Sequence, residues 1–420
     1  MGHVDDRWWR PQRNENGEVV VNGRGKPVME KTDLFGKGMR YRVRYKDPDG
    51  VVRGKSFPDR QKKRADDFLI EVESDKREGK YIDPHSSRKT FRQQGESWLK
   101  AQSPDPATRE VLRSRLEKQV YPYLGDFKFD KIEQPSTIRD FVGSMDERGL
   151  SANYQSVIFT VVSSVIDSAV DDKVIRRNPC RAKTVRRPVA RSPKVVVWEV
   201  NRLFAIRGAL VRRFRVCADL GAGAGLRQGE ILGFSPDDVD NAKGEIRIER
   251  QIKTVNGVMM FALPKGGKTR TVPVADSLLS ALGEHGSEFP AVPITLPWGK
   301  PNGELVTVRV LITGESGRMY TGDLFTKVVW QAAFRNAGIE HRGRVDGMHA
   351  LRHFFASTLL ANGCSIKELA EFLGHNDAGF TLRTYTHLVP SSYARARRAI
   401  DRVFRPNLPE RPANGLDEEM

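Results

Sequence analysis

Cysteine is scarce in this chain of 420 residues, which carries only Cys180, Cys217 and Cys364, widely spaced. None belongs to a C-x-x-C pair, so the pattern favours neither a disulfide framework nor a cysteine-based zinc module. No apolar run approaches the ~20 residues needed to cross a bilayer. The first residues also lack the apolar stretch of a secretory signal. We therefore expect a protein of a reducing cytoplasm, with no membrane segment.

Acidic residues are outnumbered. The chain has 70 lysines and arginines against 53 aspartates and glutamates, a formal net charge of +17 and a pI near 9.8. This excess predicts a polyanionic partner, with nucleic acid first and an anionic membrane second. A basic enzyme with a small substrate is the alternative. The length allows two or three domains, each able to bury a core.

The first segment changes from a polar, glycine-bearing stretch to an alternating one. Residues 39–46 run Met-Arg-Tyr-Arg-Val-Arg-Tyr-Lys, a period of two that predicts a strand with one apolar and one basic face. A turn at 47–50, a return strand at 51–57 and a helix at about 58–78 follow. We expect a small sheet backed by one helix, after a start that is disordered.

The basic face of that first strand has two interpretations. It consists of Arg40, Arg42, Arg44 and Lys46. A two-stranded ribbon fits the DNA major groove, so the face is a candidate DNA-binding surface. Lysine and arginine are also common on strand edges, where they prevent edge-to-edge pairing. The sequence favours neither interpretation.

Residues 89–183 have apolar positions at helical spacing, which predicts a compact all-α unit of four or five helices. The stretch 151–170 starts with Ser151, a good N-cap. A basic run without acids then covers 181–194. It is either a flexible linker or a strap that lies on phosphates, and its candidate DNA-binding residues are Arg186, Arg187 and Arg191.

From residue 195 onward the pattern is mixed α/β. We expect a glycine-interrupted helix at 216–232, short antiparallel strands at 245–249, 258–263 and 271–274, and helices near 322–337, 349–362, 366–372 and 390–403. The glycines at 221, 223 and 225 do not form a dinucleotide-binding motif, because the third glycine of that motif is missing at its required spacing. The fold class is therefore multidomain α+β, with expected boundaries at 1–85 for the sheet and helix, 86–183 for the helical unit, 184–194 for the linker, 195–405 for the mixed unit and 406–420 for a polar tail.

Five reactive side chains in the mixed unit form an ordered set. They are Arg227 in Gly-Leu-Arg-Gln-Gly-Glu, His349 and Arg352 in His-Ala-Leu-Arg, His375 in Leu-Gly-His, and Tyr385. Arginines neutralise charge on phosphate oxygens. A tyrosine hydroxyl can be a covalent nucleophile, and an imidazole titrates close enough to neutrality to move its proton. Together they form a set for attack on a phosphodiester without metal, and no cluster in the sequence has metal-ligand spacing.

These four motifs, in this order over some 200 residues, resemble the tyrosine recombinase (phage integrase) family. The helical unit is similar to that family's core-binding domain. The N-terminal sheet and helix resemble, more weakly, the arm-binding domain of integrases from phages and mobile elements. The resemblance covers nearly the whole chain except its two ends.

The resemblance implies a role for each matching residue. Tyr385 would attack the scissile phosphate and form a 3′-phosphotyrosyl link. Arg227 and Arg352 would hold the non-bridging oxygens, His349 would take the proton of the nucleophile, and His375 would add a hydrogen bond to the phosphate. Glu230 is similar to an acidic residue that orients the site, although an exposed helix-surface acid is the alternative.

The family also places a lysine in a β-hairpin, where it protonates the leaving 5′-oxygen. The matching segment here is 259–274, and Lys265 follows its Leu-Pro directly. Glycine stands after this lysine instead of the commoner threonine or asparagine, so Lys268 is a competitor. The basic helix expected at 392–403 either docks on a neighbouring protomer or only adds DNA affinity.

The resemblance implies a site-specific integrase acting on double-stranded DNA attachment sites. It further implies no cofactor, a homotetramer during synapsis, accessory DNA-bending and directionality proteins, and a place at the nucleoid of a bacterial host. Three alternatives remain: a resolvase-type recombinase acting on two like sites, a type IB topoisomerase, and a non-catalytic DNA-binding regulator. The sequence does not identify the DNA sites or the crossover length.

Overall fold

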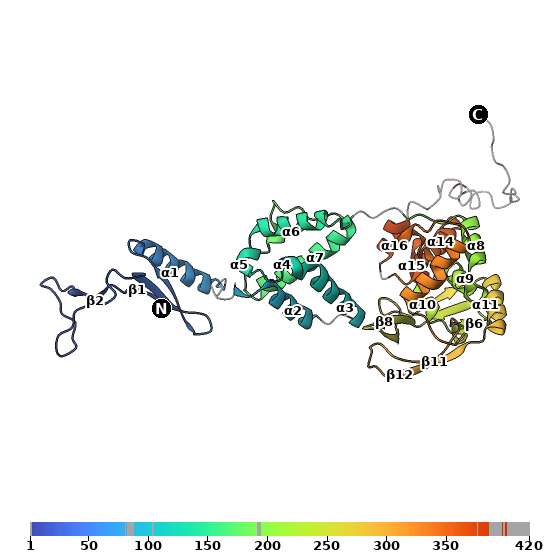
Figure 1. Ribbon diagram of the computed structural model, residues 1–420, viewed down its shortest axis with the longest axis horizontal. Helices are drawn as coiled ribbons and strands as arrows, with labels where there is room; N and C mark the ends of the chain where they lie inside the picture. The colour runs from blue at the N-terminus through green and yellow to red at the C-terminus, as the bar shows by residue number, and fades with distance from the viewer. Residues whose placement is uncertain are drawn as a thin grey trace, which may run out of the picture. The chain divides into compact units, whose positions relative to one another are not determined.

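The computed structural model describes residues 2–79, 81, 88–102, 105–190, 195–375, 377–385, 397 and 400. Internal contacts divide the chain into two units, residues 1–192 and 193–420 (Figure 1). Within the described ranges, no helix combines the length and apolar composition that crossing a membrane requires. Arg191 and most of the helix expected at 390–403 lie outside the described residues.

The first unit begins with a small antiparallel sheet and one helix. Its elements are β1 (His3–Asp6), β2 (Trp9–Pro11), β3 (Met29–Lys31), β4 (Tyr41–Lys46), β5 (Val52–Phe57) and α1 (Lys62–Arg77). Tyr41, Val43 and Tyr45 alternate with exposed residues along β4 and are buried with Ala65 and Val72 of α1. The period of two therefore predicted both the strand and its buried face.

The expectation of a disordered start is wrong for the described residues. β1 pairs antiparallel with β4 and makes the sheet order β1-β4-β5. Acids of β1 then lie near the basic face, and the Arg40 guanidinium is 2.8 Å from the Asp6 carboxylate. The pairing joins segments more than 30 residues apart. The sequence did not predict it, because the first residues are polar and show no long alternation of apolar positions.

The rest of the first unit is helical, as predicted. Its elements are α2 (Phe91–Ala101), α3 (Pro106–Arg115), η2 (Leu116–Val120), α4 (Tyr121–Leu124), α5 (Phe129–Ile132), α6 (Pro135–Glu147), α7 (Ala152–Asp171) and η3 (Pro179–Arg181). Ser151 caps α7 by accepting a hydrogen bond from the backbone N–H of Tyr154. The helices enclose an apolar core of their own.

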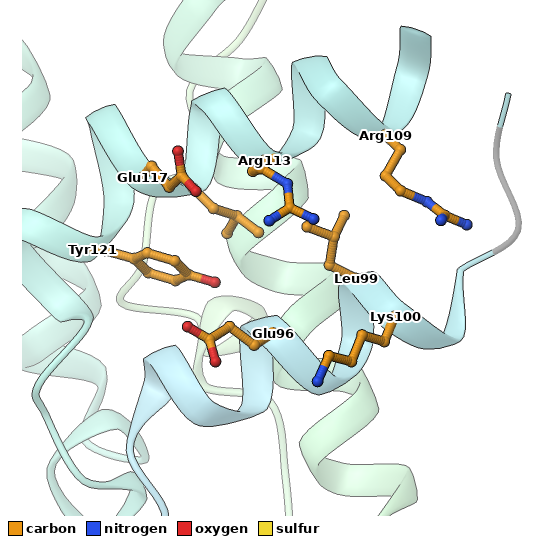
Figure 2. A pocket seen from close by; sticks show the side chains of 8 residues that line it. Glu96, Leu99, Lys100, Arg109, Arg113, Glu117 and Tyr121 are labelled. Carbon is orange, nitrogen blue, oxygen red and sulfur yellow. The ribbon is translucent and has the colours of Figure 1, made fainter. Parts of the chain in front are cut away.

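A pocket of about 230 Å³ opens between α2 and the helix formed by α3 and η2 (Figure 2). Arg109, Arg113 and Lys100 line it together with the carboxylates of Glu96 and Glu117. Burial raises the pKa of the Tyr121 hydroxyl beside them to about 12. Charges of both signs meet here, so the pocket lacks the purely basic lining of a phosphate site.

The second unit is mixed α/β. Its elements are α8 (Val200–Ala209), η4 (Arg212–Phe214), α9 (Arg215–Ala224), α10 (Gln228–Leu232), η5 (Pro236–Asp238), β6 (Val239–Asp240), β7 (Glu245–Ile248), β8 (Gln251–Val255), β9 (Val258–Ala262), β10 (Arg270–Pro273), α11 (Asp276–Glu288), β11 (Val292–Pro297), β12 (Leu305–Val310), α12 (Gly322–Phe325), η6 (Thr326–Trp330), α13 (Gln331–Asn336), η7 (Gly343–Asp346), α14 (His349–Ala361), α15 (Ile366–Leu373) and α16 (Ala378–Tyr385).

The expected hairpin at 259–274 is wrong. β9 pairs with β8, and β10 pairs with β7 in a different sheet. The turn between β8 and β9 is Asn256-Gly257, both with positive φ, which is the strongest short signal for a two-residue hairpin turn. The lysine-bearing segment 263–269 is therefore a connection between two small sheets.

The glycine-rich end of α9 brings distant motifs together. A Cβ on Gly221 would lie 2.6 Å from the Leu351 side chain of α14. The missing side chain therefore lets α14 pack directly against α9. This contact sets the helix carrying His349 and Arg352 beside the turn that carries Arg227, and the glycines serve packing instead of nucleotide binding.

Candidate active site

Arg227 stands at the start of α10, where its backbone N–H donates to Glu230 Oε2 at 2.8 Å. Its guanidinium donates to Glu230 Oε1 at 2.9 Å and to the Leu373 carbonyl at 3.2 Å. The spacing of three residues places the acid one turn along the same helix. The carboxylate therefore fixes both the backbone and the side chain of Arg227.

Glu230 is buried, which rules out the alternative of an exposed surface acid. Arg270 of β10 donates to both carboxylate oxygens, at 2.9 and 2.7 Å. Burial alone would raise the pKa of Glu230, but the hydrogen bonds and charge of Arg270, with Arg227, lower it to about 2. The sequence did not point to Arg270, because a lone arginine in a short strand carries no motif.

Arg352 is enclosed within the unit, with no exposed surface. Its guanidinium donates to the Gly225 carbonyl at 2.6 Å and also to the Leu373 carbonyl. Burial, followed by the charges of Arg227 and Arg270, lowers the pKa of Arg352 to about 9. Arg352 is therefore still positively charged at pH 7. Two main-chain carbonyls hold its side chain in place.

His375 follows Gly374, which ends α15 with a left-handed conformation at φ 61°. The ring Nε2 lies 3.2 Å from an Arg352 nitrogen, and Nδ1 lies 2.7 Å from Thr381 Oγ1. Arginine only donates, so Nε2 accepts and Nδ1 carries the hydrogen. Burial and then the charge of Arg352 lower the pKa of His375 to about 4, which keeps this neutral form.

Tyr385 is the last residue of α16 and is 1% exposed. Its hydroxyl lies 2.8 Å from Nδ1 of His353, the residue after Arg352. Burial raises the pKa of Tyr385 to about 12, despite the opposing charges of Arg352 and Arg227. The tyrosine is therefore protonated in the DNA-free protein. No motif in the sequence assigns a role to His353.

His349 begins α14 and is exposed. Its ring centroid lies 4.7 Å from that of His353, edge to face. Although solvent reaches the side chain, the surrounding protein and then the neighbouring histidine and arginines lower the pKa of His349 to about 3. His349 is thus at the open side of the site, and His353 lies between it and Tyr385.

The start of α14 is held by a buried carboxylate, Asp346. It accepts hydrogen bonds from the Trp198 indole at 3.0 Å, from Arg202 at 2.8 Å and from the Arg342 side chain at 2.9 and 2.8 Å. Burial would raise the pKa of Asp346, but the hydrogen bonds of Arg342 and the charges of Arg202 and Arg342 lower it to about 2. Through these hydrogen bonds, Asp346 connects α8, η7 and the segment after the linker just before the start of α14.

The remaining expected residues lie elsewhere. Lys265 and Lys268 are both exposed in the connection after β9, so exposure does not distinguish between them. Arg186 and Arg187 are exposed on the first unit, where Arg187 donates to Thr160 Oγ1 at 3.0 Å. Among the described side chains, no group of three histidine, cysteine or acidic residues is placed to hold a metal ion.

Comparison with known proteins places this site in a family. Residues 199–391 match the model of the phage integrase family. A tyrosine recombinase XerC-like protein of Caldanaerobacter subterraneus subsp. tengcongensis is 27% identical over 282 residues, 64% of this chain and 70% of the relative.

Solved structures share the fold. The Tn1549 transposon integrase in complex with transposon right end DNA matches with a TM-score of 0.62 at 19% identity, over 75% of this chain and 100% of that one. A lambda integrase tetramer bound to a Holliday junction matches with a TM-score of 0.51 at 16% identity, over 80% and 93%. With their ordered site and the matching family model, residues 199–391 belong to the phage integrase family of tyrosine recombinases, enzymes that cleave and rejoin DNA.

Proposed function

We propose that this enzyme is the integrase of a phage or integrative mobile element, which inserts and excises that element at DNA attachment sites. The observation that carries the proposal is the convergence of Arg227, Arg352, His375 and Tyr385 into one connected site, although they are spread over more than 150 residues. They supply the charge, the hydrogen-bond donor and the nucleophile that transfer of a DNA strand needs.

In the proposed reaction, the Tyr385 oxygen attacks the scissile phosphorus and a P–O bond forms. The bond to the 5′-oxygen breaks, leaving the DNA 3′ end on the enzyme. Arg227 and Arg352 donate to the non-bridging oxygens, where negative charge grows in the transition state. Glu230 acts through Arg227, holding its guanidinium in the direction the phosphate requires.

Proton transfers complete the step. A histidine of α14 takes the Tyr385 proton, and Lys265 gives one to the departing 5′-oxygen, with Lys268 the alternative. His375 accepts from Arg352 in the free protein, so it needs a proton on Nε2 to donate to phosphate. The phosphate charge favours that proton, because it offsets the arginines that lower the pKa of His375.

The other parts of the chain have proposed roles in DNA binding. The helical domain at 86–183, the linker at 184–194 and the catalytic domain at 195–405 would bind the core site, and the N-terminal domain at 1–85 a distal arm site. Recombination cuts and joins two duplexes, so four protomers are required, as in the lambda integrase tetramer. Bending and directionality proteins at the host nucleoid would complete the assembly. The phosphotyrosine conserves the bond energy, so no cofactor is needed.

A resolvase-type recombinase acting on two like sites is the second candidate, favoured by the XerC-like relative. The N-terminal sheet and helix favour the integrase, because those resolvases resemble this chain without such a domain. A mobile-element integrase joins two different sites. Recombination assays with two like sites against two unlike sites separate these candidates.

The test of cleavage uses full-length protein and duplexes carrying candidate attachment sites, nicked near the crossover. The nick lets the cleaved end diffuse away, so a covalent adduct accumulates on a denaturing gel. We expect an adduct with the wild-type protein and none with Tyr385→Phe, at equal DNA binding. Tight, salt-sensitive binding with no adduct on any site would instead support a non-catalytic regulator.

A further inference from the structure

We infer that His353, and not His349, is the catalytic residue that receives the proton of Tyr385 during DNA cleavage. The inference deepens the proposed function and rests on it. It starts from a contact: His353 Nδ1 lies 2.8 Å from the Tyr385 oxygen, within the usual length of an O–H···N hydrogen bond. No direct contact joins His349 to that oxygen among the hydrogen bonds of the described residues.

The protonation states agree with a hydrogen bond that Tyr385 donates to His353. Tyr385 is protonated, because burial raises its pKa, and so its hydroxyl is the donor. Burial and then the charge of Arg352 lower the pKa of His353 to about 4, so its ring is neutral and Nδ1 can accept. The groups that face His353 are His349 and Arg352 on its own helix, Tyr385 on α16, and His375 after α15.

Position on α14 explains why two histidines are present. His349 and His353 are four residues apart, on one face of the helix. His349 is at the exposed start of the helix, whereas His353 is partly buried against the nucleophile. The two rings meet edge to face, so a proton on one disfavours a proton on the other. Only one of the two rings is therefore expected to carry a proton when the bond forms.

The proposed step balances. The Tyr385 O–H bond breaks and its proton moves to His353 Nδ1, while the oxygen lone pair forms the bond to phosphorus. The 5′-oxygen leaves with the electrons of its broken bond and takes a proton from the lysine of the proposed function. In rejoining, the 5′-hydroxyl gives its proton back to that lysine as it attacks phosphorus, and His353 returns its proton to the departing phenolate oxygen.

The test measures single-turnover adduct formation on a nicked attachment-site duplex, together with DNA binding. His353→Ala removes the acceptor, whereas His353→Asn keeps a polar group near the Nδ1 position but cannot hold the proton. We expect both to slow adduct formation by about 10²-fold or more, the range for a lost general base, with DNA binding unchanged. His285→Ala is the matched control, because His285 is another buried histidine of this unit with a lowered pKa, packed on α11 away from the site.

Two results would overturn the inference. A wild-type rate in His353→Ala, with a slow His349→Ala, would return proton acceptance to His349. Recovery of the rate in His353→Asn would show that a hydrogen bond suffices and that no proton is taken up.

A second substrate distinguishes a role at the nucleophile from a role at the leaving group. A duplex with sulfur in place of the bridging 5′-oxygen has a leaving group that needs no proton. It should restore cleavage to Lys265→Ala but not to His353→Ala. Restoration of His353→Ala would place His353 at the leaving group and overturn the inference.

Absence of any adduct with the wild-type protein would count against the proposed function, which is a separate result. The hydrogen bond is then measured without DNA, by NMR of protein labelled with ¹³C at tyrosine Cζ, with Tyr385 identified by its loss in Tyr385→Phe. We expect His353→Ala to shift the Tyr385 signal. An unchanged signal overturns the inference without reference to cleavage.

Discussion

Arginines of the N-terminal sheet and arginines of the catalytic unit carry the same charge in opposite surroundings. Arg40 and Arg44 pair with Asp6 and Asp5 across the sheet, with side chains 24% and 49% exposed. Arg270 and Arg352 are 5% and 0% exposed and bind a buried carboxylate or main-chain carbonyls. Exposed pairs contribute little and rearrange easily, whereas buried ones are costly to disturb. The arginines of the sheet therefore remain accessible to solvent, whereas those of the catalytic unit are held in a fixed geometry.

The largest effect is expected from Arg352→Lys. Lysine keeps the charge but cannot donate to Gly225 and Leu373 in the fork geometry of arginine. We expect adduct formation to fall by about 10³-fold, with DNA binding retained. Arg44→Lys is the matched change on the sheet and should leave adduct formation on a short core duplex unchanged. Equal losses in both variants would remove the contrast between the regions.

Loss of Arg270 should be the largest effect on folding. Arg270→Gln leaves the buried Glu230 carboxylate with Arg227 alone. We expect the free energy of unfolding in urea to fall by about 3–5 kcal/mol. Arg44→Gln, which breaks an exposed pair, should cost within about 1 kcal/mol. The double variant Arg270→Gln with Glu230→Gln should cost less than the two single losses together, because no buried charge is left unpaired.

Acid should weaken the catalytic unit through the same carboxylates. The pKa of Glu230 is lowered from 4.5 to about 2, and that of Asp346 from 3.8 to about 2. A carboxyl group whose pKa is lower in the folded than in the unfolded state stabilises the fold at any pH above its unfolded pKa. This stability is lost as the pH falls from about 4.5 towards 2. For Glu230 the loss is about 3 kcal/mol. Unfolding free energies measured between pH 6 and 3 should show a steeper fall in the wild type than in Glu230→Gln.

The smallest effect should come from the exposed sheet face. Arg42 and Lys46 are exposed on β4, and replacing both with alanine should change stability by less than about 0.5 kcal/mol. If they bind phosphates, the slope of log affinity against log salt for an arm-site duplex should fall by about 0.9 per contact. An unchanged slope would favour the alternative of a strand edge protected by charge.

Sequence patterns predicted the elements that depend on local periodicity and the site residues that depend on the order of motifs. The strand at 39–46, the Ser151-capped helix and the five ordered site residues all follow from spacing that the chain itself shows. The prediction of a hairpin at 259–274 is wrong because the turn that reverses the chain is Asn256-Gly257, which pairs β9 with β8 and leaves β10 to another sheet.

Arg270 and His353 could not be found in that way. Their roles arise from contacts across 40 and 32 residues, which join β10 to α10 and α14 to α16 in the folded chain. Neither residue differs in type from many exposed arginines and histidines. What identifies them is burial next to an ordered motif. Burial of a single polar residue leaves no periodic pattern in the sequence, so it cannot be predicted from spacing.

The guanidinium and carboxylate groups around Glu230 have a consequence for the energetics of strand exchange. Arg227, Arg270 and Arg352 face one carboxylate, and the three nearby histidines are neutral near pH 7 because their pKa values are lowered. Three positive groups against one negative group leave two positive charges among these described residues. A phosphodiester brings one negative charge, and the five-coordinate state formed by phenolate attack carries two. These two positive charges therefore match the doubled negative charge on the phosphate oxygens most closely at the halfway point, while the proton of Tyr385 stays within the site on His353. Forward and reverse transfer pass through that same state, so these charges hasten both without choosing between them.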